Sequence, residues 1–146
     1  MADGLPMWLG GVQIPSGRGF VAHSDGDVAI HALCDALLGA AAMGDIGLHF
    51  PDKSPLWKGA DSKDLLRRVV GIIAEKGWKP GNADITIALQ APKLRPFIDT
   101  MRSTLAPILG IDEDAVSVKA TTTEHLGFVG RGEGCEAWAV VTICKD

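Results

Sequence analysis

The chain has 146 residues, of which 47% are hydrophobic and 22% charged, a composition that excludes a disordered polymer and suits one globular domain. Its formal net charge of -4 argues against a general binder of nucleic acid or of anionic membranes, because both need a basic surface. The sequence has no secretory signal, no apolar run of membrane-helix length and no CxxC pair among its three cysteines. We therefore expect a soluble, cytoplasmic protein in a reducing compartment.

Hydrophobic periodicity and turn residues predict elements in the order β-α-α-β-α-β-β. The first strand covers residues 7–14, with a bulge or close backbone approach at Gly10-Gly11, and a turn follows at 15–19. Helices are predicted over 25–43, from a cap at Asp61 or Ser62 to Gly77, and over 96–109; strands are predicted over 84–90, 116–121 and 136–144. Residues 45–60 have neither period and are predicted to be a loop.

This order predicts an α+β fold, in which residues 1–146 form a single α/β sandwich domain. We expect one mostly antiparallel sheet with helices on one face. The last strand, residues 136–144, is apolar on both of its faces. Such a strand needs cover on both sides, which we expect from the domain's own helices and from a neighbouring subunit.

Residues 23–31 combine polar, turn-prone side chains with the start of the first predicted helix. Asp27, His31 and Asp35 are four residues apart, so on a helix they share one face within about 80° of arc. Taken singly, each is more often a helix cap or a satisfied hydrogen-bonding group than a catalytic residue. As a group, the two histidines and three aspartates of residues 23–35, around a glycine turn, indicate a metal or phosphate site, and the spacing leaves both open.

A second polar segment ends the strand over 116–121. Lys119, the threonines at 121–123 and Arg131 are donors suited to phosphate oxygens, and the glycines of 127–134 let backbone N–H groups approach an anion. Glu124 is suited to a hard cation such as Mg²⁺ between phosphates. The alternative interpretation is a tight turn followed by a solvated loop.

Residues 91–96 lead into the N-terminus of the third predicted helix, a favoured place for an anion or for backbone recognition of a base. The alternative there is a proline-capped helix start with solvated Lys93 and Arg95. The sequence has no Gly-x-Ser-x-Gly elbow, Walker loop or dinucleotide-binding glycine motif. A phosphoryl-transfer enzyme without a protein nucleophile must let its substrate attack itself, while the protein supplies metals, positioning and charge stabilisation.

These motifs together resemble the 2-C-methyl-D-erythritol 2,4-cyclodiphosphate synthase family of the non-mevalonate isoprenoid pathway. The resemblance runs in order from Gly10 to the last strand and is carried by residues 23–33, 44–47, 50–52, 91–93, 119–124 and 127–134. It implies a homotrimer that assembles through its sheets, with active sites between subunits. It also implies a lyase reaction, in which the 2-phosphate of 4-diphosphocytidyl-2-C-methyl-D-erythritol 2-phosphate attacks the β-phosphate, the cyclic diphosphate closes and CMP leaves.

The resemblance also implies roles for individual residues. His31 is a zinc ligand, Glu124 faces Mg²⁺ or Mn²⁺, and His23 with Thr122 stabilises the charge of the transition state. The methylerythritol part is held by His23, Ser24, Asp45, Ile46, Gly47, Phe50, Pro51, Asp52, Lys53 and Ser54. The cytidine diphosphate is held by Leu89, Gln90, Ala91, Pro92, Lys93, Leu94, Arg95, Thr121, Thr122, Thr123 and Glu124. Phe128 and Arg131 contact substrate or line the trimer axis, where an isoprenoid diphosphate is a further expected partner.

One departure from the family pattern bears on zinc. Family members carry an Asp-x-His pair near the N-terminus that supplies two further zinc ligands, and this sequence has no Asp-x-His. We expect that the chain lacks the first strand of the family, through a misplaced start, a truncation or fusion to another enzyme of the pathway. Three hypotheses remain: a functional synthase, a non-catalytic trimer that binds cytidine nucleotide or isoprenoid diphosphate, and, weakest, an unrelated metal-dependent phosphohydrolase.

Overall fold

The computed structural model describes residues 1–51 and 60–146. The chain opens with two small antiparallel strand pairs. β1 (Ala2–Asp3) pairs with β4 (Arg18–Gly19), and between them in sequence β2 (Met7–Leu9) pairs with β3 (Val12–Ile14). The remaining α-helices and strands are α1 (Val28–Ala40), α2 (Ile46–His49), α3 (Ser62–Glu75), β5 (Trp78–Ala88), α4 (Ile98–Leu109), β6 (Val116–Thr121), α5 (Gly127–Gly130) and β7 (Glu136–Lys145). Two 3-10 helices, η2 (Arg95–Phe97) and η3 (Glu113–Ala115), precede α4 and β6. The predicted order of major elements is confirmed.

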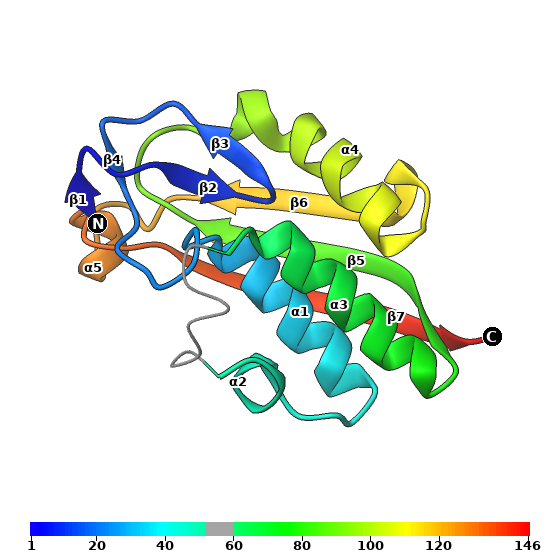
Figure 1. The fold of residues 1–146 in the computed structure, drawn as a ribbon. Coiled ribbons are helices and arrows are strands. Elements are labelled where there is room, and N and C mark those ends of the chain that lie inside the picture. The colour runs from blue at the N-terminus through cyan, green and yellow to red at the C-terminus, as the bar shows by residue number, and fades with distance from the viewer. Residues whose placement is uncertain (52–59) are drawn as a thin grey trace.

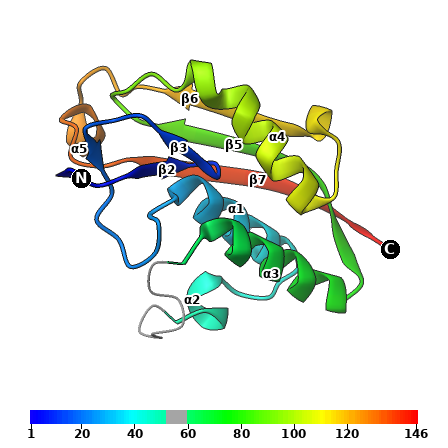
Figure 2. The same cartoon turned by 45° about the horizontal axis from the view of Figure 1, so that its top comes forward.

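The central sheet has three strands in the order β6-β5-β7. β5 and β7 are antiparallel, whereas β5 and β6 are parallel because α4 returns the chain to the same end of the sheet. The α+β prediction is confirmed, and in detail the sheet is mixed. Helices α1, α3 and α4 lie on one face of it, as Figure 1 and the tilted view in Figure 2 show.

The core lies between these helices and the inward face of the sheet. Ala83, Ile85 and Ile87 point inward from β5 and are buried. The helices contribute buried apolar residues three or four positions apart, including Ile30, Leu33 and Leu37 of α1, Leu66, Val69 and Ile73 of α3, and Ile98, Met101, Leu105 and Leu109 of α4. This spacing is that of one helix face, which explains why the helices were predictable from sequence.

The outward face of the sheet carries exposed apolar side chains. Trp138 is 55% exposed and Val140 is 71% exposed, both on β7. Nearby on the same face, Lys119 Nζ lies 2.9 Å from Asp84 Oδ2. In the described chain β7 is therefore covered on one face only, and cover from a neighbouring subunit stays a prediction.

The strand predicted over 7–14, with its irregularity at Gly10-Gly11, is two strands, β2 and β3, that pair as a hairpin. Gly10 and Gly11 form its turn, with φ of 62° and 77°, a conformation that glycine adopts without steric cost. The predicted close approach is confirmed, since a Cβ on Gly10 would lie 2.7 Å from Met101 Cγ.

Several predicted boundaries also differ from the structure. Helix α1 begins at Val28 rather than residue 25, because the Asp27 side chain accepts the Ile30 N–H and ends the preceding turn. Strand β5 begins six residues earlier than predicted, since its pairing with β7 continues past a register shift between Pro80 and Asn82. Single helical turns, α2 and α5, occur where loops were predicted.

Candidate active site

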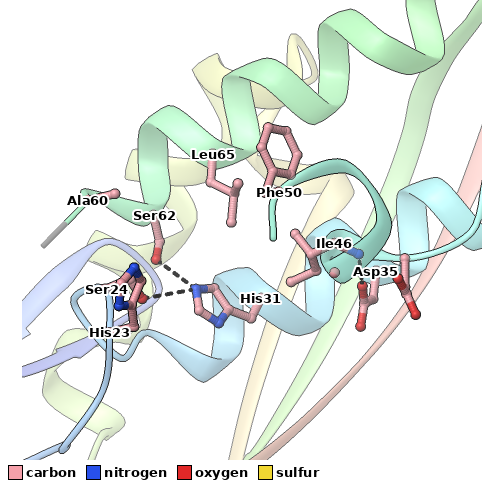
Figure 3. A pocket seen from close by; sticks show the side chains of 11 residues that line it. His23, Ser24, His31, Asp35, Ile46, Phe50, Ala60, Ser62 and Leu65 are labelled. Atoms are coloured by element: carbon pink, nitrogen blue, oxygen red, sulfur yellow. Dashed lines mark hydrogen bonds between the residues drawn. The ribbon is translucent and has the colours of Figure 1, made fainter. Parts of the chain in front are cut away.

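The predicted binding residues gather mainly in two pockets. The first has a volume of about 290 Å³ and lies between the start of α1, α2 and the start of α3. Figure 3 shows how the labelled side chains surround it. Its lining includes the predicted residues His23, Ser24, His31, Asp45, Ile46, Gly47 and Phe50.

Asp27 fixes the position of α1 beside this pocket. Its side chain is fully buried and accepts the Gly10 N–H at 3.0 Å, the Gly11 N–H at 2.7 Å and the Ile30 N–H at 3.0 Å. Burial raises the pKa of the Asp27 carboxyl, and the three backbone donors oppose that rise. One carboxylate therefore joins the β2–β3 turn to the N-terminus of α1, and it contributes no ligand to the pocket.

The polar residues of the first helix, a stripe along one face, thus have two different roles, backbone hydrogen bonding and lining of the pocket. Asp35 also serves the backbone, since it accepts the Ile46 N–H at 2.9 Å, and Asp45 caps α2 by accepting the Leu48 N–H at 3.0 Å. His31, the middle member of the stripe, presents its ring to the pocket. Backbone hydrogen bonds account for Asp27, Asp35 and Asp45, although Asp35 and Asp45 also line the pocket. The site interpretation of the stripe applies to His31.

The His31 ring is held by two hydroxyl groups. Its Nε2 atom lies 3.1 Å from Ser62 Oγ and 3.4 Å from Ser24 Oγ. Ser62 is a lining residue that the sequence prediction missed, because its place at a helix start indicated only a cap. A hydroxyl at the first turn of a helix that follows a long loop was the available signal.

The second pocket has a volume of about 150 Å³ and lies where β5 and β6 end beside the start of α4. The Leu89 N–H donates to the Thr121 carbonyl at 3.0 Å, which holds the two strand ends together. Its lining includes the predicted residues Leu89, Gln90, Pro92, Lys93, Leu94, Arg95, Thr121 and Thr122. Ala91 lies between them and lines a neighbouring hollow with His125 and Arg131.

The segment after β6 turns sharply at Glu124, where φ is 54°. The Glu124 N–H donates to Thr122 Oγ1 at 3.3 Å, and Thr123 Oγ1 donates to the Leu126 carbonyl at 2.7 Å. Glu124 is exposed and follows Thr122 of the second pocket by two residues. A single exposed carboxylate fits Mg²⁺, which binds through one or two carboxylates together with substrate phosphates.

The remaining predicted residues lie outside both pockets. Phe128 is partly exposed, and Arg131 pairs with Glu133 at 3.1 Å, a contact that holds the pKa of the Glu133 carboxyl below its ordinary value. Pro51 is exposed. Asp52, Lys53 and Ser54 lie outside the described residues.

The described residues do not complete a zinc site. Within residues 1–51 and 60–146, no three His, Cys, Asp or Glu side chains lie close enough together to hold a metal ion. His31 supplies one nitrogen, whereas zinc takes at least three protein ligands.

Within residues 1–51 and 60–146, no helix is long and apolar enough to span a membrane.

Comparison with known proteins gives one consistent result. The model of the YgbB family matches residues 1–144. The chain is 64% identical over 135 residues to the 2-C-methyl-D-erythritol 2,4-cyclodiphosphate synthase of Pseudomonas aeruginosa strain UCBPP-PA14, covering 92% of this chain and 86% of that protein. It is 56% identical over 143 residues to the synthase of Symbiobacterium thermophilum, covering 98% and 91%.

Solved structures agree with these matches. The bifunctional IspDF of Campylobacter jejuni superposes with a TM-score of 0.95 at 44% identity, over 99% of this chain and 39% of that one. A 2-C-methyl-D-erythritol 2,4-cyclodiphosphate synthase solved with bound CDP superposes with a TM-score of 0.89 at 38% identity, over 98% and 93%. The chain therefore belongs to the YgbB family, together with the 2-C-methyl-D-erythritol 2,4-cyclodiphosphate synthases that it matches over nearly its whole length.

Proposed function

We propose that this chain is a 2-C-methyl-D-erythritol 2,4-cyclodiphosphate synthase of the non-mevalonate isoprenoid pathway. A 2-phosphate oxygen of 4-diphosphocytidyl-2-C-methyl-D-erythritol 2-phosphate attacks the β-phosphorus. A new P–O bond closes the ring, the bond from the β-phosphorus to the CMP oxygen breaks, and CMP leaves. The observation that carries the proposal is 64% identity to a synthase over 135 residues, a span that includes both pockets.

The separation of the two pockets supports an active site built between subunits. Among the described residues their linings share none, yet one substrate must place its methylerythritol part in one and its cytidine part in the other. Two copies of the chain can meet this need if the first pocket of one copy faces the second pocket of the next. The exposed Trp138 and Val140 on the outward sheet face support a homotrimer, because burial of apolar area drives association.

We assign the chemistry to charge stabilisation rather than to a protein nucleophile. His23 and Thr122 would donate to the phosphoryl oxygens as the β-phosphorus becomes five-coordinate. Lys93 and Arg95 precede α4 at the second pocket and add positive charge where the nucleotide diphosphate would lie. Phe128 and Arg131 would contact substrate or an isoprenoid diphosphate at the trimer axis.

The proposal includes two metal sites, one for Mg²⁺ or Mn²⁺ at Glu124 and one for zinc at His31. Glu124 would hold Mg²⁺ or Mn²⁺ against the diphosphate, where the cation neutralises charge. His31 would be one zinc ligand, and the described residues leave its coordination incomplete. The relative from Campylobacter jejuni is bifunctional, which supports fusion or association of this chain with another pathway enzyme.

The incomplete zinc site favours one alternative, a non-catalytic trimer that binds cytidine nucleotide. Zinc content per subunit, measured beside CMP release from the substrate, separates the two functions. A synthase releases CMP in proportion to the zinc that it holds. CDP binding without zinc and without turnover would leave the binding protein as the function of this chain.

A further inference from the structure

Three side chains from separate segments form a hydrogen-bonded chain beside the first pocket. Ser62 Oγ donates to Asp25 Oδ1 at 2.5 Å, and the Ser62 N–H donates to Asp25 Oδ2 at 2.8 Å. On its other side, Ser62 Oγ lies 3.1 Å from His31 Nε2, a contact drawn in Figure 3. Ser62 is only 1% exposed, so water does not compete for its hydroxyl.

The supply of hydrogens decides the direction of each contact. An ionised carboxylate only accepts hydrogen bonds, and a serine hydroxyl has one hydrogen to donate. Because Ser62 gives that hydrogen to Asp25, its oxygen can only accept from His31. The hydrogen in this contact must therefore lie on His31 Nε2.

The second hydroxyl near the ring is compatible with this direction. Ser24 Oγ lies 3.4 Å from the same nitrogen and accepts the Gly26 N–H at 3.3 Å, and a hydroxyl oxygen has a second lone pair that can accept the Nε2 hydrogen. If Nε2 instead carried a lone pair, it would face the Ser62 oxygen at 3.1 Å with no hydrogen between them. A partly buried polar contact of that kind is unfavourable.

We propose that Asp25 and Ser62 are positioning residues that hold His31 as the Nε2–H tautomer. The Nδ1 atom is then the ring nitrogen with a free electron pair, and it is the one that can bind a cation or accept a hydrogen from a ligand. Carboxylate-oriented histidines of this kind have a fixed ring direction as well as a fixed tautomer. The tautomer of His31 is inferred without the proposed function. Only the identity of the group that Nδ1 contacts in the pocket rests on that function.

The arrangement also explains how the pocket wall is held in place. Asp25 belongs to the segment before α1, and Ser62 is the first residue of α3. The Asp25 N–H donates to the Ala60 carbonyl at 3.2 Å, so backbone contacts join the same two segments. Removing only the Ser62 hydroxyl leaves these backbone contacts in place, and the fold of Ser62→Ala should be retained.

The test is long-range ¹H–¹⁵N NMR of the His31 ring in metal-free protein with the imidazole neutral, with the signals assigned by their loss in His31→Ala. We expect a slowly exchanging proton on Nε2 in the unaltered chain. Ser62→Ala should lose this protected proton and give fast exchange between tautomers, and Ser62→Thr should restore it. Ser103→Ala is the matched control, since Ser103 Oγ donates only to the Thr100 carbonyl on the exposed side of α4.

A ring proton on Nδ1 in the unaltered chain, or an unchanged His31 signal in Ser62→Ala with native backbone spectra, would overturn the inference. The measurement needs neither zinc nor substrate. Its failure is therefore distinguishable from a failure of the proposed function, which zinc content and CMP release test separately.

Discussion

The buried Asp27 carboxylate offers the sharpest test of how the pocket is supported. Its Oδ1 atom accepts the N–H groups of Gly10 and Ile30, and its Oδ2 atom accepts that of Gly11 at 2.7 Å. In Asp27→Asn one oxygen becomes an NH₂ group. If the amide keeps the first two contacts, its own N–H groups face the Gly11 N–H.

The expected cost follows from that clash. The Gly11 N–H loses its acceptor and the new Asn N–H groups gain none, in a partly buried place, at about 1–3 kcal/mol for each donor. Relief from burying a charge offsets part of this, since desolvation is the largest influence on the pKa of Asp27. We expect a net loss of about 2–3 kcal/mol in the free energy of unfolding, or roughly 5–10 °C in Tm for a chain of this size.

The assay is urea unfolding of both proteins at one protein concentration, because oligomer stability depends on concentration. Asp61→Asn is the matched control: Asp61 caps α3 by accepting the Lys63 N–H at 2.9 Å from an exposed position, and asparagine caps helices about as well. We expect its midpoint to stay near that of the unaltered chain. Equal midpoints for Asp27→Asn and Asp61→Asn would refute the reasoning.

Three further predictions concern the metal, the sheet face and pH. His31→Ala should remove zinc from any zinc-containing form of the enzyme. It should leave CDP affinity within about twofold, since His31 lines the first pocket and not the second. Metal analysis and calorimetry check this, and retained zinc would show that the ligand assignment is wrong. Trp138→Glu should shift the oligomer to monomer in sedimentation, because it would bury a charge in the proposed interface. Ala74→Glu, on the exposed side of α3, should leave the oligomer unchanged. A trimer in both variants would exclude the outward sheet face as the interface. Lys119→Met should cost less than about 1 kcal/mol at neutral pH because the pair is exposed. The Lys119 hydrogen bond lowers the pKa of Asp84, so this contribution is present above the ordinary carboxyl pKa and is lost as the pH falls through the lowered one; urea midpoints that differ equally at neutral and strongly acid pH would contradict it.

Regular periodicity made the helices and two strands predictable from sequence. Leu66, Val69 and Ile73 repeat at helical spacing in α3, and Val116 and Val118 alternate with exposed residues in β6. The first residues of β5 were missed because Pro80 and Gly81 argue against a strand, whereas pairing with β7 overrides that local preference.

The candidate site was predictable as a set of residues and not as an arrangement. Sequence spacing placed Asp27, His31 and Asp35 on one helix face, but it could not tell which side chains serve the backbone. That depends on contacts with Gly10, Gly11 and Ile46, which are distant in sequence from α1 or follow a turn. The role of Ser62 also needs a contact between segments 37 residues apart, which no local pattern records.

The most direct measurement follows the products by ³¹P NMR when the purified chain, with excess Zn²⁺ and Mg²⁺, is given 4-diphosphocytidyl-2-C-methyl-D-erythritol 2-phosphate. Intramolecular attack predicts CMP and 2-C-methyl-D-erythritol 2,4-cyclodiphosphate in equal amounts, with no open diphosphate. CMP accompanied by an open, hydrolysed product, or no CMP from protein that binds CDP, would contradict the account.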